Sequence, residues 1–230
     1  MSNAILVAAL STDPFQSVVD GVEFLEVRGQ TPGQDGFEVI LRTKATKDGP
    51  SDLLRNQKKE DNLIIAGELA LVGKKGDPDE GKPIIFVSSV CVATDDQYFN
   101  EATLVGRFAK ESKQAEKSSS RTVIVNRYRK KPDNSFEQIP DYFRIRGFGT
   151  HKDKIDSSSK GALVEATGVL TSQTNKEGKT YTELKVRRIR SHEKGSGGYK
   201  KSDPSEGKAA SGYDHKHFMG SDEDSIPTNW

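Results

Sequence analysis

The segment Asp141–Phe148 combines residue types and a spacing that suit contact with a nucleic acid. Successive side chains of a β-strand point to opposite faces, so Phe143 and Ile145 share one face, as core residues would. The opposite face carries two aromatic rings and two guanidinium groups, those of Tyr142, Arg144, Arg146 and Phe148. Rings stack on bases, at about 1–3 kcal/mol per base, and guanidinium groups pair with phosphates. Because a double helix hides the faces of its bases, this pattern favours unpaired strands.

Further rings and basic residues lie near this segment in the sequence. The run Asn126–Lys131 adds a ring at Tyr128 and several positive charges. Taken alone, a Tyr or Phe belongs to a core more often than to a binding surface, and Phe136 is left out on that ground. The expected nucleic-acid surface consists of Arg107, Arg127, Tyr128, Arg129, Lys130, Lys131, Tyr142, Arg144, Arg146, Phe148, Lys152, Tyr181 and Arg187.

Formal charge is distributed unevenly along the 230 residues, whose net charge is +1. Residues 1–97 carry 10 Lys or Arg and 16 Asp or Glu, a net charge of −6. Residues 98–192 carry 20 and 11, a net charge of +9, and residues 193–230 carry 5 and 7, a net charge of −2. A polyanion is therefore expected to bind the middle segment and to be repelled by both flanks.

The sequence repeats itself at an offset of 97 to 101 residues. Ser2–Leu10 matches Phe99–Arg107, and Lys82–Ala93 matches Lys179–Arg190. A period of this length indicates two copies of a whole domain, since solenoid repeats span about 20–50 residues. In the second copy, β-branched and aromatic residues predict the strands Glu101–Phe108, Arg121–Tyr128, Asp141–Phe148, Leu163–Thr171 and Lys179–Ile189.

A polar stretch with helical spacing follows the third strand of each copy, at Pro50–Lys59 and Lys152–Ser159. Five strands with an insertion after the third is the order of the OB fold, although an SH3-like barrel or an open sheet could also hold five strands. The expected fold class is all-β, with two tandem OB-fold barrels followed by a disordered C-terminal tail. The expected boundaries are 1–97 and 98–190 for the barrels, 191–220 for a flexible linker and 221–230 for an acidic tip.

The third strand of the first copy, Phe37–Lys44, presents a different outer face. That face carries Glu38, Ile40, Arg42 and Lys44, without an aromatic ring. Because this copy is also net acidic, we expect it to bind nucleic acid weakly or not at all, and to serve structure or the pairing of chains.

The composition disfavours several classes of protein. The N-terminus lacks a signal-peptide pattern and no apolar run approaches the ~20 residues that span a bilayer, so a soluble cytoplasmic protein is expected. Its expected binding of nucleic acid would make it nucleoid-associated. The single cysteine, Cys91, is expected to be a small buried hydrophobe. The sequence shows no Ser/His/Asp or paired-carboxylate arrangement and no closed set of metal ligands. We therefore expect neither an enzyme nor a cofactor or metal site.

The composition changes again after Arg190. Ser191–Gly212 is rich in Gly, Ser, Lys and Ala without apolar periodicity, which is typical of a flexible linker. The chain then ends in an acidic run and a small apolar terminus, whose expected partner-binding residues are Asp222, Glu223, Asp224, Ile226, Pro227 and Trp230.

These segments resemble the bacterial single-stranded DNA-binding protein family in its tandem-OB form. Asn100–Arg107 is similar to the family's opening strand. Tyr142–Gly149 is similar to its Trp-His-Arg-Val-Val-x-Phe-Gly strand, with Tyr142 in the place of the stacking tryptophan and Phe148 in that of the phenylalanine. The tail resembles the family's acidic tip, except that the family ends in Phe and this chain runs on to Trp230.

The resemblance implies that the chain binds single-stranded DNA with little sequence preference and protects it. It further implies that the tip recruits partner proteins during DNA replication, recombination and repair, and that a homodimer supplies four barrels. Two alternatives remain open from the residues alone. The chain could be an OB-fold adaptor between proteins, or it could bind RNA, which OB folds also recognise.

Overall fold

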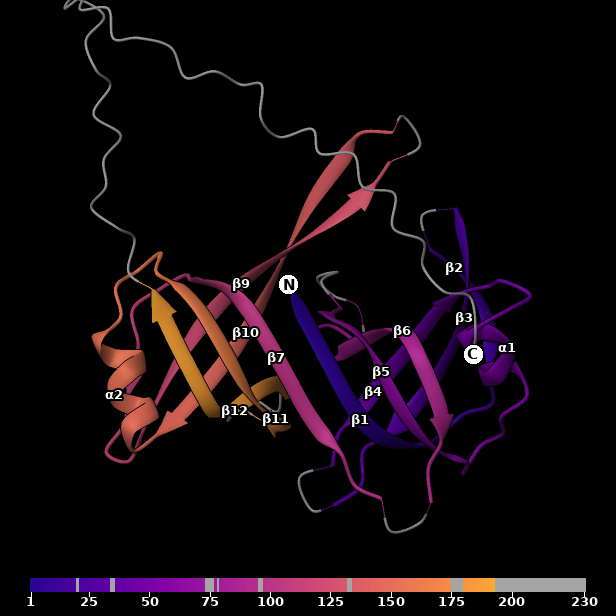
Figure 1. Cartoon of the computed structure of the whole chain (residues 1–230), viewed down its shortest axis with the longest axis horizontal. Helices are drawn as coiled ribbons and strands as arrows, with labels where there is room; N and C mark the ends of the chain where they lie inside the picture. Colours follow the sequence, from indigo (N-terminus) through magenta and orange to yellow (C-terminus); the bar gives the residue numbers. More distant parts are fainter. Residues whose placement is uncertain are drawn as a thin grey trace, which may run out of the picture. The chain divides into compact units, whose positions relative to one another are not determined.

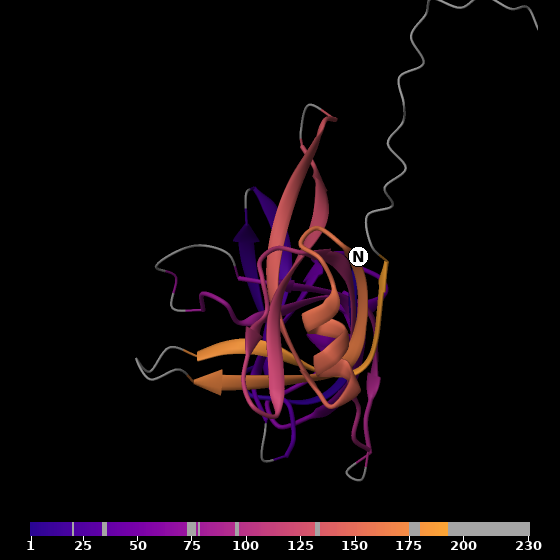
Figure 2. The same ribbon diagram turned by 90° about the vertical axis from the view of Figure 1, so that its left-hand side faces the viewer.

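The computed structural model describes residues 1–19, 21–33, 36–72, 77, 79–94, 97–131, 134–174 and 180–192, without the side chains of Thr174 and Thr180. Residues 175–179, the expected linker from residue 193 onward and the acidic tip lie outside these residues. Figures 1 and 2 show the described part in colour.

The first half of the chain closes into a barrel. β1 pairs with β3 and β5 antiparallel, β3 pairs with β4 antiparallel, and β4 pairs with β6 in parallel. The antiparallel pair of β5 and β6 completes the ring, and β2 extends it at the edge beside β3. The elements are β1 (Ser2–Leu10), β2 (Phe15–Val19), β3 (Val22–Gln30), β4 (Glu38–Lys44), α1 (Pro50–Arg55), β5 (Asn62–Leu71) and β6 (Pro83–Val92).

The second half closes in the same order. β7 pairs with β9 and β11 antiparallel, β9 pairs with β10, β10 pairs with β12 in parallel, and β11 pairs with β12. This closed order, with the helix after the third barrel strand, is that of the OB fold, and it excludes the SH3-like and open-sheet alternatives. The elements are β7 (Asn100–Phe108), β8 (Lys113–Gln114), β9 (Ser118–Lys130), β10 (Phe136–Phe148), α2 (Thr150–Ser157), β11 (Leu163–Thr174) and β12 (Thr180–His192).

The strands are rich in β-branched residues, and buried and exposed side chains alternate along them. The buried side chains point inward and fill the barrels. On β4, Val39 and Leu41 are buried inward, and Phe143 and Ile145 are their counterparts on β10. The helices add Leu54 and Ile155, both fully buried. At Gly147, a Cβ would lie 2.7 Å from Ile155 Cδ1, so the glycine lets α2 pack directly on β10.

The two barrels join through their first strands. β1 and β7 pair antiparallel with Ala4 opposite Ala102, so a continuous sheet runs β6-β5-β1-β7-β11-β12. Ser2 Oγ donates to the carbonyl of Leu69 at 2.5 Å, and Asn100 Nδ2 donates to that of Leu170 at 2.9 Å. Ser2 of the first barrel therefore corresponds in position to Asn100 of the second barrel. The expected match of Ser2–Leu10 with Phe99–Arg107 is wrong by one residue, a slip that would exchange the two faces of the strand.

Several other expectations need correction. Cys91 is exposed, because it points to the outer face of β6 rather than into the barrel. β9 and β10 are longer than expected, β12 continues past residue 190 to His192, and β2 and β8 were not expected. α1 ends at Arg55 rather than near Lys59. Among the described residues, no helix is long and apolar enough to cross a membrane.

Candidate nucleic-acid interface

The β9–β10 hairpin carries the candidate surface. Thirteen cross-strand pairs, from Phe136 opposite Lys130 to Phe148 opposite Ser118, hold its two strands in a continuous register. Near its base the hairpin belongs to the barrel, where Ile124 also pairs with Arg107 of β7. Residues 125–130 and 136–141 continue beyond that point as a two-stranded extension, called the arm below, which Figures 1 and 2 show rising from the second barrel.

Four aromatic side chains are exposed along one face of the hairpin. Positions 136, 142 and 148 share a face of β10 by alternation, and Tyr128 joins them because its cross-strand partner is Gln138. Successive rings on β10 are six positions apart, about 20 Å along a strand. The exposed fractions are 68% for Tyr128, 68% for Phe136, 59% for Tyr142 and 46% for Phe148. Rings exposed to this extent are available for stacking with bases.

Arg144 and Arg146 lie on the same face, between Tyr142 and Phe148. Both pair with Glu183 of β12, which is 1% exposed. Arg144 Nε lies 3.0 Å from one carboxylate oxygen of Glu183, and Arg146 Nε lies 2.6 Å from the other. The hydrogen bond to Glu183 is the largest cause of the raised pKa of Arg146. Two positive charges over one negative charge leave this part of the face net positive.

The Tyr181 ring is partly buried and contacts Arg144, so it is not an exposed ring like the other four. The guanidinium of Arg144 lies 4.9 Å from the centroid of the Tyr181 ring, a cation–π contact. Arg144 Nη2 also donates to Ser120 Oγ at 3.1 Å. Tyr181, Ser120 and Glu183 therefore each contact the Arg144 side chain.

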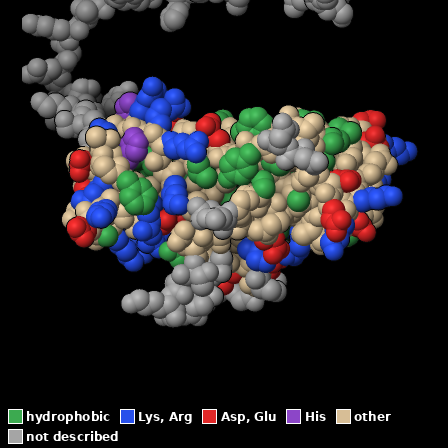
Figure 3. All heavy atoms as spheres, turned by 90° about the horizontal axis from the view of Figure 1, so that it is seen from below, with side chains coloured by type: hydrophobic (Ala, Val, Ile, Leu, Met, Phe, Trp, Pro, Cys, Tyr) green, Lys and Arg blue, Asp and Glu red, His purple; other side chains and the backbone are tan. Residues whose placement is uncertain are grey.

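The remaining basic residues of the expected surface are spread over the second barrel. Arg107 shares a cross-strand row with Ile124 and Tyr142, and it donates to the carbonyl of Gly161 at 2.8 Å. Lys152 on α2 pairs with Asp156 at 3.7 Å. Lys130, Lys131 and Arg187 are exposed. In Figure 3, Lys and Arg side chains gather at the left of the view, over the second barrel.

Arg127 and Arg129 lie on the opposite face of the hairpin from the four rings, because they flank Tyr128 on β9 and neighbouring side chains of a strand point to opposite faces. Arg127 pairs with Asp141 and lies over the ring of Phe86 in the first barrel, at 5.4 Å. Arg129 pairs with Glu137 at 2.8 Å. Asp141 Oδ1 in turn accepts from the backbone N–H of Leu71, at 3.4 Å. This face of the arm therefore contacts the first barrel.

Two residues of the surface were missed by the sequence interpretation. Phe136, expected in the core, is exposed beside Tyr128; its even spacing from Tyr142 was a usable signal. Glu183 gave no such signal, because an acidic residue counts against a nucleic-acid surface and its two arginine partners lie 37 and 39 positions away.

The same face of the first barrel has a different chemistry. Ile40, Ala70 and Ile84 form a small buried apolar cluster there. By strand pairing, Ile40 opposite Ile84 corresponds to Arg144 opposite Glu183. The charged residues beside the cluster neutralise one another through the pairs Arg42–Glu26 (2.7 Å), Arg28–Glu38 (2.6 Å), Arg28–Asp79 (2.5 Å) and Lys82–Asp79 (2.8 Å). Hydrogen bonds from Arg28 and Lys82 hold the pKa of the Asp79 carboxyl far below its usual value.

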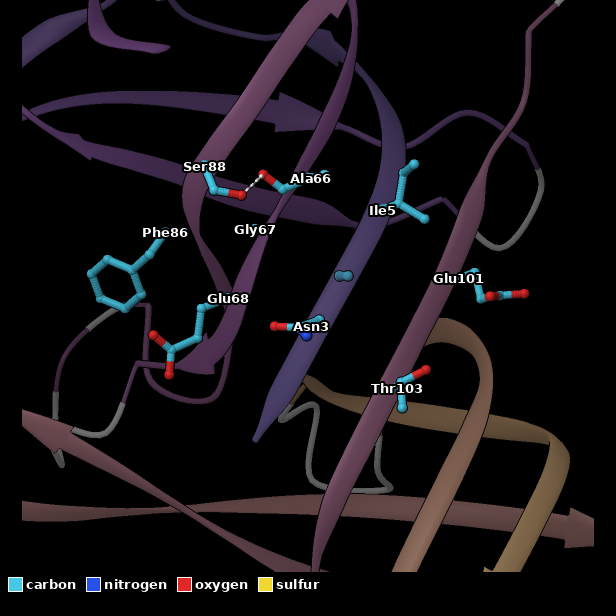
Figure 4. A pocket seen from close by; sticks show the side chains of 10 residues that line it. Asn3, Ile5, Ala66, Gly67, Glu68, Phe86, Ser88, Glu101 and Thr103 are labelled. Carbon is cyan, nitrogen blue, oxygen red and sulfur yellow. Dashed lines mark hydrogen bonds between the residues drawn. The ribbon is translucent and has the colours of Figure 1, made fainter. Parts of the chain in front are cut away.

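An open groove of about 630 Å³ crosses the junction of β1 and β7. Figure 4 shows its lining, which includes Asn3, Ile5, Glu68, Phe86 and Glu101. Two carboxylates and no Lys or Arg are among the described lining residues, so this groove does not suit a polyanion.

No protein-family model matches the chain, and no curated protein matches it in sequence. The solved structures that share its fold include two of one protein. One is the wild-type single-stranded DNA-binding protein from Thermus aquaticus, with 12% identity, a TM-score of 0.58 and coverage of 92% of this chain and 97% of that chain. The other is a deletion mutant of the same protein, with 10% identity, a TM-score of 0.58 and coverage of 84% and 94%. Across both barrels, the chain therefore has the fold of a bacterial single-stranded DNA-binding protein.

Proposed function

We propose that this chain binds single-stranded DNA with little sequence preference and performs no chemistry on it. The observation that carries the proposal is the face of β9 and β10 on which Tyr128, Phe136, Tyr142 and Phe148 are exposed around Arg144 and Arg146. Stacking of bases on the rings and contacts of phosphates with the guanidinium groups together hold an unpaired strand without reading its sequence. The shared fold with the Thermus protein supports this assignment.

The second barrel supplies this surface, and β4, the corresponding strand of the first barrel, carries no aromatic ring. The net charge of +9 on residues 98–192 draws the polyanion to the second barrel. The first barrel carries an apolar cluster and neutralised ion pairs at the corresponding place. We assign residues 1–97 to the first barrel and residues 98–192, where β12 ends, to the second, and we assign a supporting role to the first barrel.

The proposal is tested by fluorescence-anisotropy titration of labelled oligo(dT) and of a duplex, with the wild-type chain and with Tyr142→Ala/Phe148→Ala. The single strand should bind far more tightly than the duplex, and the double variant should lose about 2–6 kcal/mol, the contribution of two stacked bases. Affinity should fall with salt by about 0.7 log units per log unit of salt for each phosphate contacted. If the wild-type chain binds neither DNA, the adaptor function replaces this proposal; tighter binding of RNA of the same sequence would favour an RNA-binding role.

We further propose that residues 221–230 recruit replication and repair proteins. The proposed contact residues are Asp222, Glu223, Asp224, Ile226, Pro227 and Trp230. We also propose that the chain acts in the cytoplasm as a homodimer.

The acidic charges of residues 221–230 would also compete with DNA for the basic face of the second barrel. Deleting Ser221–Trp230 should then tighten DNA binding at low salt and abolish capture of partners. Unchanged affinity would remove the competition, and light scattering of the intact chain tests the dimer.

A further inference from the structure

A buried carboxylate lies in the middle of a surface that must attract a polyanion. Glu183 is 1% exposed, yet it lies directly beneath Arg144 and Arg146. Arg146 contacts it through two atoms, Nε at 2.6 Å and Nη2 at 3.3 Å, and Arg144 contacts it through Nε at 3.0 Å. On charge alone, an acid at this place weakens the attraction of DNA.

Burial of a carboxylate costs several kcal/mol unless charged partners and hydrogen bonds satisfy it. Here the two guanidinium groups supply those partners, so both arginines are held near the carboxylate in the folded chain. Ser120 and the ring of Tyr181 hold Arg144 further. A guanidinium group has five N–H donors, and these contacts leave donors on both arginines for a phosphate. Their side chains remain 34% and 28% exposed.

The first barrel shows that an OB barrel of this chain needs no carboxylate at this position. Strand pairing places Ile84 where the second barrel has Glu183, and Ile40 where it has Arg144. Ala70 pairs with Ile84, as Thr171 pairs with Glu183. The apolar set Ile40, Ala70 and Ile84 is buried and packed, so the polar set Arg144, Thr171 and Glu183 is not a requirement of the fold.

We propose that Glu183 is a positioning residue, which fixes Arg144 and Arg146 in a preset arrangement for the phosphates of single-stranded DNA. The inference rests on the proposed function and adds a role that charge alone does not predict. Both arginine side chains lose their rotamer freedom when the chain folds rather than when DNA binds, so less entropy is lost on binding. The gain from orientation then exceeds the attraction that the acid removes.

The direction in which one substitution changes the affinity for DNA tests this role. Glu183→Gln removes a negative charge from the surface, so a purely electrostatic role predicts tighter binding of DNA. A positioning role predicts weaker binding, by about tenfold, the equivalent of one lost charge-assisted hydrogen bond. Anisotropy titration of oligo(dT) at several salt concentrations measures both the affinity and the number of phosphates contacted.

The matched control is Glu26→Gln in the first barrel. Glu26 is also a buried carboxylate paired with an arginine, since Arg42 Nη2 lies 2.7 Å from it, and the change in net charge is the same. This control should leave the affinity within about twofold, because long-range charge effects are screened. Affinity of Glu183→Gln equal to or above that of the wild-type chain overturns the inference while the proposed function stands. Absence of binding by the wild-type chain overturns the proposed function itself.

A second comparison covers the case in which Glu183→Gln does not fold. Arg144→Ile/Thr171→Ala/Glu183→Ile places the first barrel's apolar set in the second barrel, and a packed apolar set often replaces a buried ion pair without loss of stability. This triple variant should bind more weakly than Arg144→Ile alone, with a salt slope lower by about 0.7, because Arg146 has lost its anchor. Equal or tighter binding by the triple variant overturns the inference.

Discussion

The two barrels of this chain both have apolar inner faces, and their outer faces differ in chemistry. On the third barrel strand, Val39 and Leu41 of the first correspond to Phe143 and Ile145 of the second, and all four are buried. The outward residues change from Glu38, Ile40, Arg42 and Lys44 to Tyr142, Arg144, Arg146 and Phe148. Closure of the barrel depends on the inward set alone, so the outward set is free to carry a binding surface in one copy and ion pairs in the other.

The barrels also differ in the length of one hairpin. In the first barrel, β3 ends at Gln30 and β4 begins at Glu38. In the second barrel, the corresponding strands β9 and β10 continue further and form the arm. The arm contacts the first barrel through Asp141, which accepts from Leu71, and through Arg127 over Phe86. Thr182, beside Tyr181, donates to the carbonyl of Gly81 of the first barrel at 3.2 Å. The first barrel therefore supports the surface of the second, and its corresponding strand β4 carries no aromatic ring.

The largest effect is expected when the first barrel's side chains replace those of the second. Tyr142→Glu/Phe148→Lys should lower the affinity for oligo(dT) by about 30-fold or more, because two stacking contacts are lost at about 1–3 kcal/mol each, while the added carboxylate and ammonium leave the net charge unchanged. Anisotropy titration measures the loss. Phe15→Ala, which removes a 41% exposed ring from the first barrel, is the control and should have little effect. Retained affinity in the double variant would place the DNA on another surface.

A smaller effect is expected at the end of the arm. Phe136→Ala should weaken binding of a long oligo(dT) by about 1 kcal/mol, roughly fivefold, the lower end of the range for one stacked base. A short oligomer that covers only Tyr142 and Phe148 should bind equally well with or without the ring. Phe136→Tyr keeps a ring and should restore the affinity for the long oligomer. Equal losses for long and short oligomers would argue against a separate contact on the arm.

The smallest effect concerns stability in the first barrel. Asp79 accepts from Arg28 and Lys82, and its pKa is depressed in the folded chain. Its contribution is therefore present above the unfolded pKa of about 3.9 and is lost as the pH falls toward the folded value. Asp79→Asn should lower the free energy of unfolding at pH 7 by at most about 1 kcal/mol, because solvent screens the pairs.

Thermal unfolding of Asp79→Asn and the wild-type chain between pH 7 and pH 2 checks this sign. The difference in midpoint should be largest at neutral pH and shrink in acid, and DNA affinity should not change. A difference that grows as the pH falls would contradict the assignment of these ion pairs to stability.

Local pattern was enough for much of the fold and part of the surface. Alternation along Asp141–Phe148 separated the buried Phe143 from the exposed Tyr142 and Phe148, because a strand determines the direction of each side chain by position alone. The same rule, extended along β9 and β10, would have included Phe136 and separated Arg127 and Arg129 from the rings. Those positions were judged by residue type instead, and Cys91 was wrongly expected to be buried for the same reason.

By itself, the sequence determined two OB barrels, the contrast in charge between them and the strand that carries the rings, since hydrophobic spacing and net charge are local properties. Only the tertiary structure decided which charges meet. The parallel pairing of β10 with β12 brings Glu183 beneath Arg144 and Arg146, and the antiparallel pairing of β9 with β10 brings Arg127 to Asp141. Such partners are separated by a turn or by a whole helix and strand. Their meeting depends on barrel closure, which no local pattern of residues records.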